Sequence, residues 1–99
     1  MPTQTTRVIG LIKLIDLAAF EIYRGQVGAT VEAFGGNVLF RGAIGEMPWN
    51  DLGCEGFDAV VEIEFPDSNS AHAWAKSPAY QKLLNIRRQA MKLTLFFAD

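Results

Sequence analysis

The chain is poor in cysteine and histidine, the residues that build disulfide frameworks and many metal sites. It holds one cysteine, Cys54, and one histidine, His72, among 99 residues. A single cysteine excludes an internal disulfide and makes a reducing, cytoplasmic location the default expectation. A lone histidine has no Cys or His companion at ligand spacing, and no glycine-rich phosphate loop opens a helix. We therefore expect no metal site and no cofactor.

Long apolar runs and an excess of basic charge are also missing. The longest apolar stretches fall far below the ~20 residues of a membrane span. Residues 1–7 are polar and lack the apolar core of a signal peptide. The net charge is −2 and the pI about 5.3, so no general positive field attracts nucleic acid. We expect neither nucleic acid nor a membrane among the partners.

Apolar surface, by contrast, is abundant for so short a chain. Hydrophobic residues make up 49% of the sequence, and phenylalanine occurs seven times. We expect residues 1–99 to form one domain with an ordered core of about 7–98. A domain of this size buries only about two-thirds of the surface its unfolded chain exposes. Part of the apolar surface is therefore expected to face a second copy, which predicts a homodimer.

Charge is distributed unevenly along the second half of the chain. Residues 46–67 carry seven acids and no bases, whereas residues 68–98 carry five bases and no acids. One interpretation is that an acidic segment lies beside a basic one in the fold or in the dimer. The other is that the basic segment forms a wall for an anionic ligand.

The first third of the chain predicts a strand followed by a helix. Residues 7–15, RVIGLIKLI, are aliphatic on both sides, which is typical of a central strand. Asp16 is a plausible N-cap for a helix over residues 17–34, whose apolar residues recur at three-and-four spacing. Gly25 and Gly28 inside this helix indicate either a kink or a close approach to the backbone.

A second strand is predicted over residues 37–46, after a glycine pair that ends the helix. Strict alternation places Arg41 on the same side of this strand as Leu39. Val38 and Phe40 then share the opposite side. Two further glycines near the end of the strand suggest a bulge or a twist.

A loop and a well-defined strand follow. Residues 47–56 contain the Pro, Asn, Asp and Gly that mark a loop. Residues 57–65 alternate between an apolar face and a largely acidic face that includes Glu64. Pro66 ends this strand.

The last third of the chain predicts two helices and a final strand. A short helix begins at Asp67 or Ser68, and a second one has Ser77 as N-cap, Pro78 at its first position and an end near residue 89. Residues 92–98 form the last strand. The order β-α-β-β-α-β is the ferredoxin-like pattern, an α+β fold with a four-stranded antiparallel sheet and helices on one face. The other face would be too apolar for water unless two sheets packed together.

Three blocks resemble a known family. They are FGGNVLFRG at 34–42, VVEIEFPDSNSAHAWAKSPAYQ at 60–81 and IRRQA at 86–90. These blocks are similar to those of domain of unknown function family 1330, in the dimeric α+β barrel superfamily, and the resemblance runs from about residue 8 to 97. It implies a homodimeric barrel with a pocket and implies no particular reaction. Asn37 and Ala75 depart from the family pattern, which often has arginine and an aromatic residue there.

Arg41 and Glu64 are the candidate catalytic residues. Each is expected on the more polar side of its strand, and the two strands are neighbours in this topology. They form either an internal ion pair that fixes the packing, or a site in which Arg41 binds a carboxylate or enolate and Glu64 accepts a proton. The partner of Arg41 is thus Glu64, the other subunit or a ligand.

Four further residues complete the expected ligand-binding set. Tyr23, Trp74 and Tyr80 are either core aromatics or walls of a cleft between helices and sheet. Arg87 either turns inward toward this cleft or is solvated beside its neighbour. His72 and Cys54 are expected to have no role in catalysis or metal binding.

We expect a homodimeric α+β barrel protein that binds a small organic ligand, anionic or aromatic. Whether it is an enzyme stays open. The first alternative is a cofactor-free monooxygenase- or isomerase-like enzyme, by analogy of fold alone. The second is a structural or regulatory dimer whose core is filled and holds no ligand.

Overall fold

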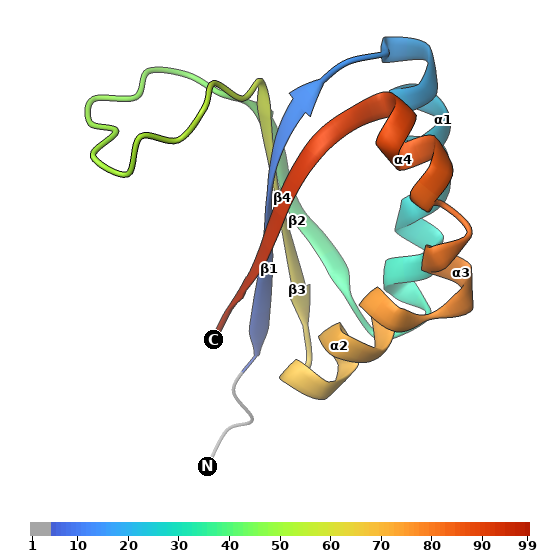
Figure 1. The fold of residues 1–99 in the computed structure, drawn as a ribbon. Helices are drawn as coiled ribbons and strands as arrows, with labels where there is room; N and C mark the ends of the chain where they lie inside the picture. The colour runs from blue at the N-terminus through green and yellow to red at the C-terminus, as the bar shows by residue number, and fades with distance from the viewer. Residues whose placement is uncertain (1–4) are drawn as a thin grey trace.

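Four antiparallel strands form one sheet, and the helices pack against one of its faces. This computed structural model describes residues 5–99 (Figure 1). The elements are β1 Thr6–Leu14, α1 Leu17–Glu32, β2 Asn37–Ala43, β3 Ala59–Phe65, α2 Ser68–Lys76, α3 Pro78–Gln81, α4 Leu84–Ala90 and β4 Met91–Ala98. The predicted α+β, ferredoxin-like architecture is confirmed. We call the face under the helices the inner face and the other the outer face.

The strand order is β2-β3-β1-β4, so β1 lies in the centre of the sheet. The two-sided apolar pattern of residues 7–15 predicted this position. All three strand pairs are antiparallel. In this order the first strand, β1, and the last strand, β4, are neighbours. At one end of this strand pair the Thr6 hydroxyl donates to the Asp99 carboxylate at 2.5 Å.

The helices start where the sequence places capping residues. Asp16, Asp67 and Ser77 are the N-caps of α1, α2 and α3, and each side chain accepts a bond from the backbone N–H three residues on. The bond from the Ala19 amide, which is the largest influence, lowers the pKa of Asp16. Pro78 occupies the first turn of α3, as predicted.

The predicted helix over residues 78–89 is in fact two short helices. The break between α3 and α4 falls at Lys82 and Leu83. The Leu83 N–H bonds to the Tyr80 carbonyl at 2.9 Å, a step of three residues instead of four. Such a step tightens the helical turn and interrupts the α-helix.

The glycine pair after α1 plays two separate roles. Gly35 has a φ of 79°, the left-handed conformation that was predicted for it. Gly36 does not have a positive φ but is buried, and a Cβ placed there would lie 2.7 Å from atoms of Phe65 and Val31. The turn into β2 therefore depends on one glycine for its torsions and on the other for close packing.

The core lies between the inner face and the helices. Its largest fully buried side chains are Trp74, Phe65, Val8 and Val31. The outer face has no such cover within residues 5–99: Phe40 is 53% exposed there and Phe96 45% exposed. No helix of the described residues is long and apolar enough to cross a membrane.

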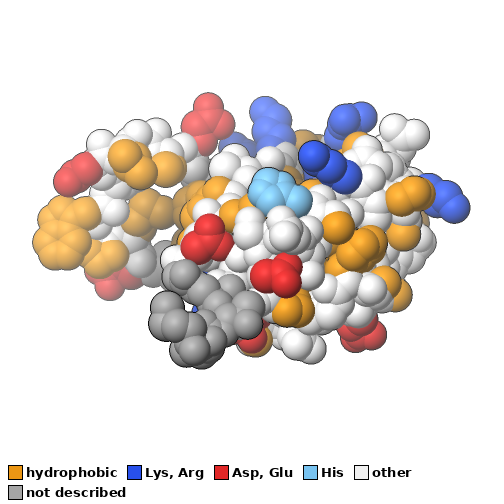
Figure 2. Space-filling view, turned by 90° about the horizontal axis from the view of Figure 1, so that it is seen from below, with side chains coloured by type: hydrophobic (Ala, Val, Ile, Leu, Met, Phe, Trp, Pro, Cys, Tyr) orange, Lys and Arg blue, Asp and Glu red, His pale blue; other side chains and the backbone are white. Residues whose placement is uncertain are grey.

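The connection between β2 and β3, residues 44–58, projects away from the helices on the outer side of the sheet (Figure 1). We call it the β2–β3 loop. Trp49 is 81% exposed and Leu52 92% exposed within it. Figure 2 shows hydrophobic side chains at this projecting end of the molecule, with acidic side chains beside them.

Candidate functional site

A cavity of about 330 Å³ lies between α1 and the inner face of the sheet. Cavities from about 300 Å³ upward hold small organic molecules. The wall is formed by Ile12, Leu14, Phe20, Tyr23, Arg24, Val27, Val31, Val38, Arg41, Gly42, Ala43, Asp58, Ala59, Val60, Val61, Ile63, Trp74, Met91, Leu93 and Leu95. Three of the expected ligand-binding residues, Tyr23, Arg41 and Trp74, are therefore part of this wall. Most of the other lining side chains are apolar.

The mouth of the cavity is marked by its exposed lining residues. These are Arg24 on α1, Arg41 and Ala43 on β2, and Asp58 just before β3. The cavity thus opens between α1 and β2, which is an edge strand of the sheet. The charged groups of the lining lie at this opening, whereas the interior is lined by aliphatic and aromatic side chains.

A β-bulge in β2 places Arg41 at the cavity. Val38 pairs with Ile63, and Phe40 pairs with Glu62, so Leu39 is the extra residue. Beyond the bulge, Arg41 pairs with Val61 and lies on the inner face. The predicted alternation, which put Arg41 beside Leu39 and opposite Val38, was wrong because an extra residue reverses the parity of the strand.

Arg41 is bound to no carboxylate among residues 5–99. The ion pairs of this part of the chain involve Arg7 and Arg24 only. Nη2 of Arg24 lies 3.6 Å from Oε2 of Glu21. Both side chains are about half exposed, so this ion pair contributes little to stability. Both arginines at the mouth are consequently accessible to an anion.

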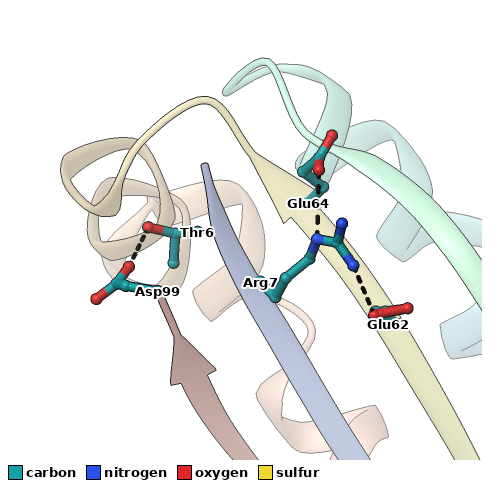
Figure 3. Close-up of polar contacts among 5 residues, drawn as sticks. All are labelled: Thr6, Arg7, Glu62, Glu64 and Asp99. Carbon is teal, nitrogen blue, oxygen red and sulfur yellow. Dashed lines mark hydrogen bonds and ion pairs between the residues drawn. The ribbon is translucent and has the colours of Figure 1, made fainter. Parts of the chain in front are cut away.

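Glu64 lies on the outer face and does not pair with Arg41. Its carboxylate accepts a bond from Nε of Arg7 at 3.3 Å, and Arg7 also donates to Glu62 at 2.9 Å (Figure 3). The first alternative for Arg41, an ion pair with Glu64 of the same chain, is therefore wrong. The bulge turns Arg41 inward, whereas Glu64, next to buried Phe65, points outward.

Tyr23, Tyr80 and Arg87 form one hydrogen-bonded chain. The two tyrosine hydroxyls lie 3.0 Å apart, and Nη1 of Arg87 donates to the Tyr80 hydroxyl at 2.9 Å. Burial raises the pKa of Tyr23 well above its ordinary value, and the neighbouring Tyr80 adds to this effect. Tyr23 lines the cavity, whereas Tyr80 and Arg87 lie behind it.

Trp74 is both a core residue and part of the cavity wall. It is 1% exposed, and its ring lies 4.6 Å from the Tyr80 ring and 5.4 Å from the Phe65 ring, measured between centroids. Its indole N–H donates to the Thr30 hydroxyl at 3.1 Å, which in turn donates to the Val27 carbonyl. The fold therefore supplies both the hydrogen-bond acceptor of the indole N–H and the aromatic contacts of the ring.

Arg24 and Asp58 are the mouth residues that the sequence analysis missed as site candidates. Arg24 was the one polar residue on the apolar stripe of α1, and this exception was the available signal. Asp58 gave no signal, because it looked like one of several outward acids of its strand. Its Oδ2 accepts a bond from the Leu14 N–H at 2.8 Å, which holds the carboxylate at the opening.

His72 and Cys54, which were not expected to belong to the site, are not part of the cavity wall. His72 is exposed and packs edge-on against Phe97, with ring centroids 4.8 Å apart. Cys54 is exposed in the β2–β3 loop. Within residues 5–99, no three His, Cys, Asp or Glu side chains gather into a group that could hold a metal ion.

The sheet order and the one-sided helical layer define a ferredoxin-like α+β protein with a cavity between α1 and the sheet. The chain belongs to the family described as Domain of unknown function (DUF1330), whose model matches residues 6–99. Comparison with curated protein sequences gives no significant match.

Solved structures share the fold at low sequence identity. A protein of unknown function from Rhodopseudomonas palustris, RPA0582, is 20% identical with a TM-score of 0.80, covering 97% of this chain and 82% of its own. SnoaB, a cofactor-independent oxygenase from Streptomyces nogalater, is 10% identical with a TM-score of 0.70, covering 96% and 91%. A dimeric protein of unknown function from Bacteroides fragilis, with a ferredoxin-like fold, is 13% identical with a TM-score of 0.55, covering 96% and 95%. These likenesses concern the fold.

Proposed function

We propose that this protein is a homodimer that binds a small apolar carboxylic acid in the cavity between α1 and the sheet. The observation that carries the proposal is the position of Arg41. The bulge places Arg41 on the wall of a cavity whose interior is apolar, and Arg41 forms no ion pair with a carboxylate of residues 5–99. An apolar body would fill the interior while the acid group meets Arg41 at the mouth.

The aromatic part of the wall supports a planar ligand. Tyr23 and Trp74 line the cavity, and their hydroxyl and indole N–H groups already have partners inside the protein. They therefore offer mainly ring surface. An aromatic acid combines ring contact with these residues and a carboxylate for Arg41.

The homodimer rests on the outer face and on one relative. Phe40 and Phe96 are about half exposed on that face, beside the partly buried Ile9 and Leu11. Surfaces of this kind usually belong to protein interfaces. The Bacteroides fragilis relative is described as dimeric.

A calorimetric titration with 1-naphthoate and its neutral partner 1-naphthamide tests the ligand class. Arg41→Gln is expected to weaken naphthoate binding about ten- to a hundredfold, which corresponds to losing one charge-assisted hydrogen bond. Binding of the amide should change little, because it lacks the charge. Equal binding of naphthoate by the original protein and the variant would remove Arg41 from the site.

Arg88→Gln is the matched control, since Arg88 is exposed on α4 and outside the cavity wall. It should leave the affinity for naphthoate unchanged. A result in which neither naphthoate nor naphthamide binds the original protein would count against a ligand cavity and favour a purely structural dimer.

The second candidate is a cofactor-free oxygenase, suggested by the likeness to SnoaB. Glu64 lies on the wrong face to act as its base, and Asp58 is the carboxylate on the cavity wall. Aerobic incubation with the acids that bind, followed by mass spectrometry, would reveal an added oxygen atom. Because a shared fold supports many activities, binding is the proposal that the residues favour.

A further inference from the structure

We propose that the β2–β3 loop of one copy covers the cavity mouth of a second copy, so that each binding site is completed by its partner. This inference rests on the homodimer proposed above and adds the partner's loop to the site. The occupant of the mouth is a defined segment of this chain, with Trp49 as its apolar contact and the loop acids as its polar ones.

The loop is built to present its apolar tip to another molecule. Trp49 and Leu52 are the most exposed large hydrophobic side chains of the described residues, at 81% and 92%. The turn between them is held in shape, because the Asn50 amide exchanges two hydrogen bonds of 2.9 Å with the backbone of Cys54. An exposed tryptophan on a bonded turn is typical of an interface anchor.

The loop and the mouth lie at the same end of the sheet but on opposite sides of it. Ala43, just before the loop, and Asp58, its last residue, both line the cavity. The tip, however, points to the outer side, away from α1 (Figure 1). A chain therefore directs its tip away from its own mouth. Suppose that two copies pack with their outer faces in contact and are related by a two-fold axis parallel to the strands. The loop tip of each copy then extends toward the cavity mouth of its partner.

Charges of the loop and the mouth are complementary. Residues 44–57 contain Glu46, Asp51 and Glu55 and no Lys or Arg. The mouth carries two arginines, Arg24 and Arg41, against one acid, Asp58, whose carboxylate accepts a bond from the Leu14 N–H. Arg24 has only the weak pair with Glu21. Opposite potentials across an interface favour association and fix its register.

In such a dimer, the end of the outer face next to the β2–β3 loop lies beside the same end of the partner's outer face. Lys13 and Lys92 face one another across β1 and β4, and like charges in register are unfavourable. Glu55 from the base of the loop lines a second pocket, on the outer side of the sheet, together with both lysines. The acidic loops therefore supply the negative charge that two adjoining lysine pairs require.

Photo-crosslinking from position 49 tests the inference. Replacing Trp49 by p-benzoylphenylalanine keeps an aromatic side chain at an exposed position, and mixing heavy-isotope and normal chains identifies crosslinks between copies. The expected products join heavy to normal chains, with the attached residue on the first half of α1 or at the end of β2. The same amino acid at Gln26, exposed on α1, should give few crosslinks between copies.

Three results would overturn the inference: crosslinks within one chain, crosslinks to the outer face near Phe96, or no crosslinks in a protein that sediments as a dimer. A protein that sediments as a monomer would overturn the homodimer as well. Ligand binding is measured separately by titration, so failure of the loop contact is distinguishable from failure of the cavity.

Trp49→Ala gives a second measurement that does not depend on the photoreactive group. Because Trp49 is mostly exposed within one chain, its loss should leave the melting temperature of the monomer unchanged. The dissociation constant of the dimer is expected to rise at least tenfold. An unchanged dissociation constant would contradict the proposed contact.

Discussion

At the residue scale, the polar side chains that line the cavity differ in whether they have a partner inside the protein. Trp74 and Tyr23 have their polar atoms bonded to Thr30 and Tyr80, so both are accounted for by packing. Arg41 lines the same cavity without such a partner among residues 5–99. This contrast is the reason that the proposed function depends on the arginine.

Tyr23→Phe is expected to change how stability responds to alkaline pH. The pKa of Tyr23 is raised in the folded protein, so the unfolded chain releases this proton first as pH increases. Stability from the neutral hydroxyl is complete below the ordinary tyrosine pKa of about 10 and falls above it. Urea unfolding at pH 9 and pH 11 should show the original protein losing about 1 kcal/mol more than the variant.

At pH 8 the same variant should be less stable by about 1 kcal/mol, because its hydrogen bond to Tyr80 is lost. The pH-dependent part is the difference between the two proteins, so titration of lysines common to both cancels. Parallel losses between pH 9 and pH 11 would show that Tyr23 is not held neutral by burial.

At the element scale, one extra residue in β2 decides what the edge strand presents. Without the bulge at Leu39, simple alternation from the inward Val38 would place the side chain of Arg41 on the outer face. Gly42 then allows the Phe40 ring to lie over it, since a Cβ there would come 2.6 Å from that ring. The strand thus sends a cation inward and an aromatic ring outward.

The glycines of α1 gave two predictions, a kink or a close approach, and the described residues of one chain exclude a close approach within that chain. A Cβ at Gly25 or Gly28 would meet no other atom of residues 5–99 within 4 Å, apart from the backbone of its own helix. Gly25→Ala is therefore expected to stabilise the protein by about 1 kcal/mol, through helix propensity and a less flexible unfolded chain. Thermal unfolding should show a melting temperature several degrees higher.

Gly36→Ala is the matched control at a packed glycine. Its Cβ would lie 2.7 Å from Phe65 and from Val31, so this variant should melt at a lower temperature. A destabilised Gly25→Ala would show that this part of α1 packs against a second molecule or needs the glycine for its shape.

At the scale of the whole molecule, a second copy would cover what one chain leaves exposed. The outer face holds an apolar centre with Arg7 between Glu62 and Glu64 at one end and the Lys13–Lys92 pair at the other. Its exposed phenylalanines give the clearest test of the homodimer.

Phe96→Asp is expected to raise the dissociation constant of the dimer at least tenfold, because a charge would be buried without a partner. Sedimentation at several concentrations measures this change. Gln26→Asp, a charge added on the exposed side of α1, should leave association unaffected. Equal effects of the two substitutions would place the interface elsewhere.

Local patterns of the sequence were sufficient for the order of elements, the capping residues and the central position of β1. These features depend on neighbours in the chain: Asp16 caps the amide of Ala19, and the left-handed φ of Gly35 follows α1 directly. The inward or outward direction of Arg41 and Glu64 was not available in this way. It depends on how β2 pairs with β3, and a bulge leaves no unambiguous mark in the sequence.

The sequence by itself therefore determined an α+β fold with helices on one face and a composition rich in apolar residues. Only the tertiary structure decided that Arg41 joins Tyr23 and Trp74 at one cavity, while Glu64 pairs with Arg7 on the opposite face. The physical reason is that hydrophobic periodicity is a local property, whereas the face on which a side chain lies follows from the register of hydrogen bonds between strands distant in sequence.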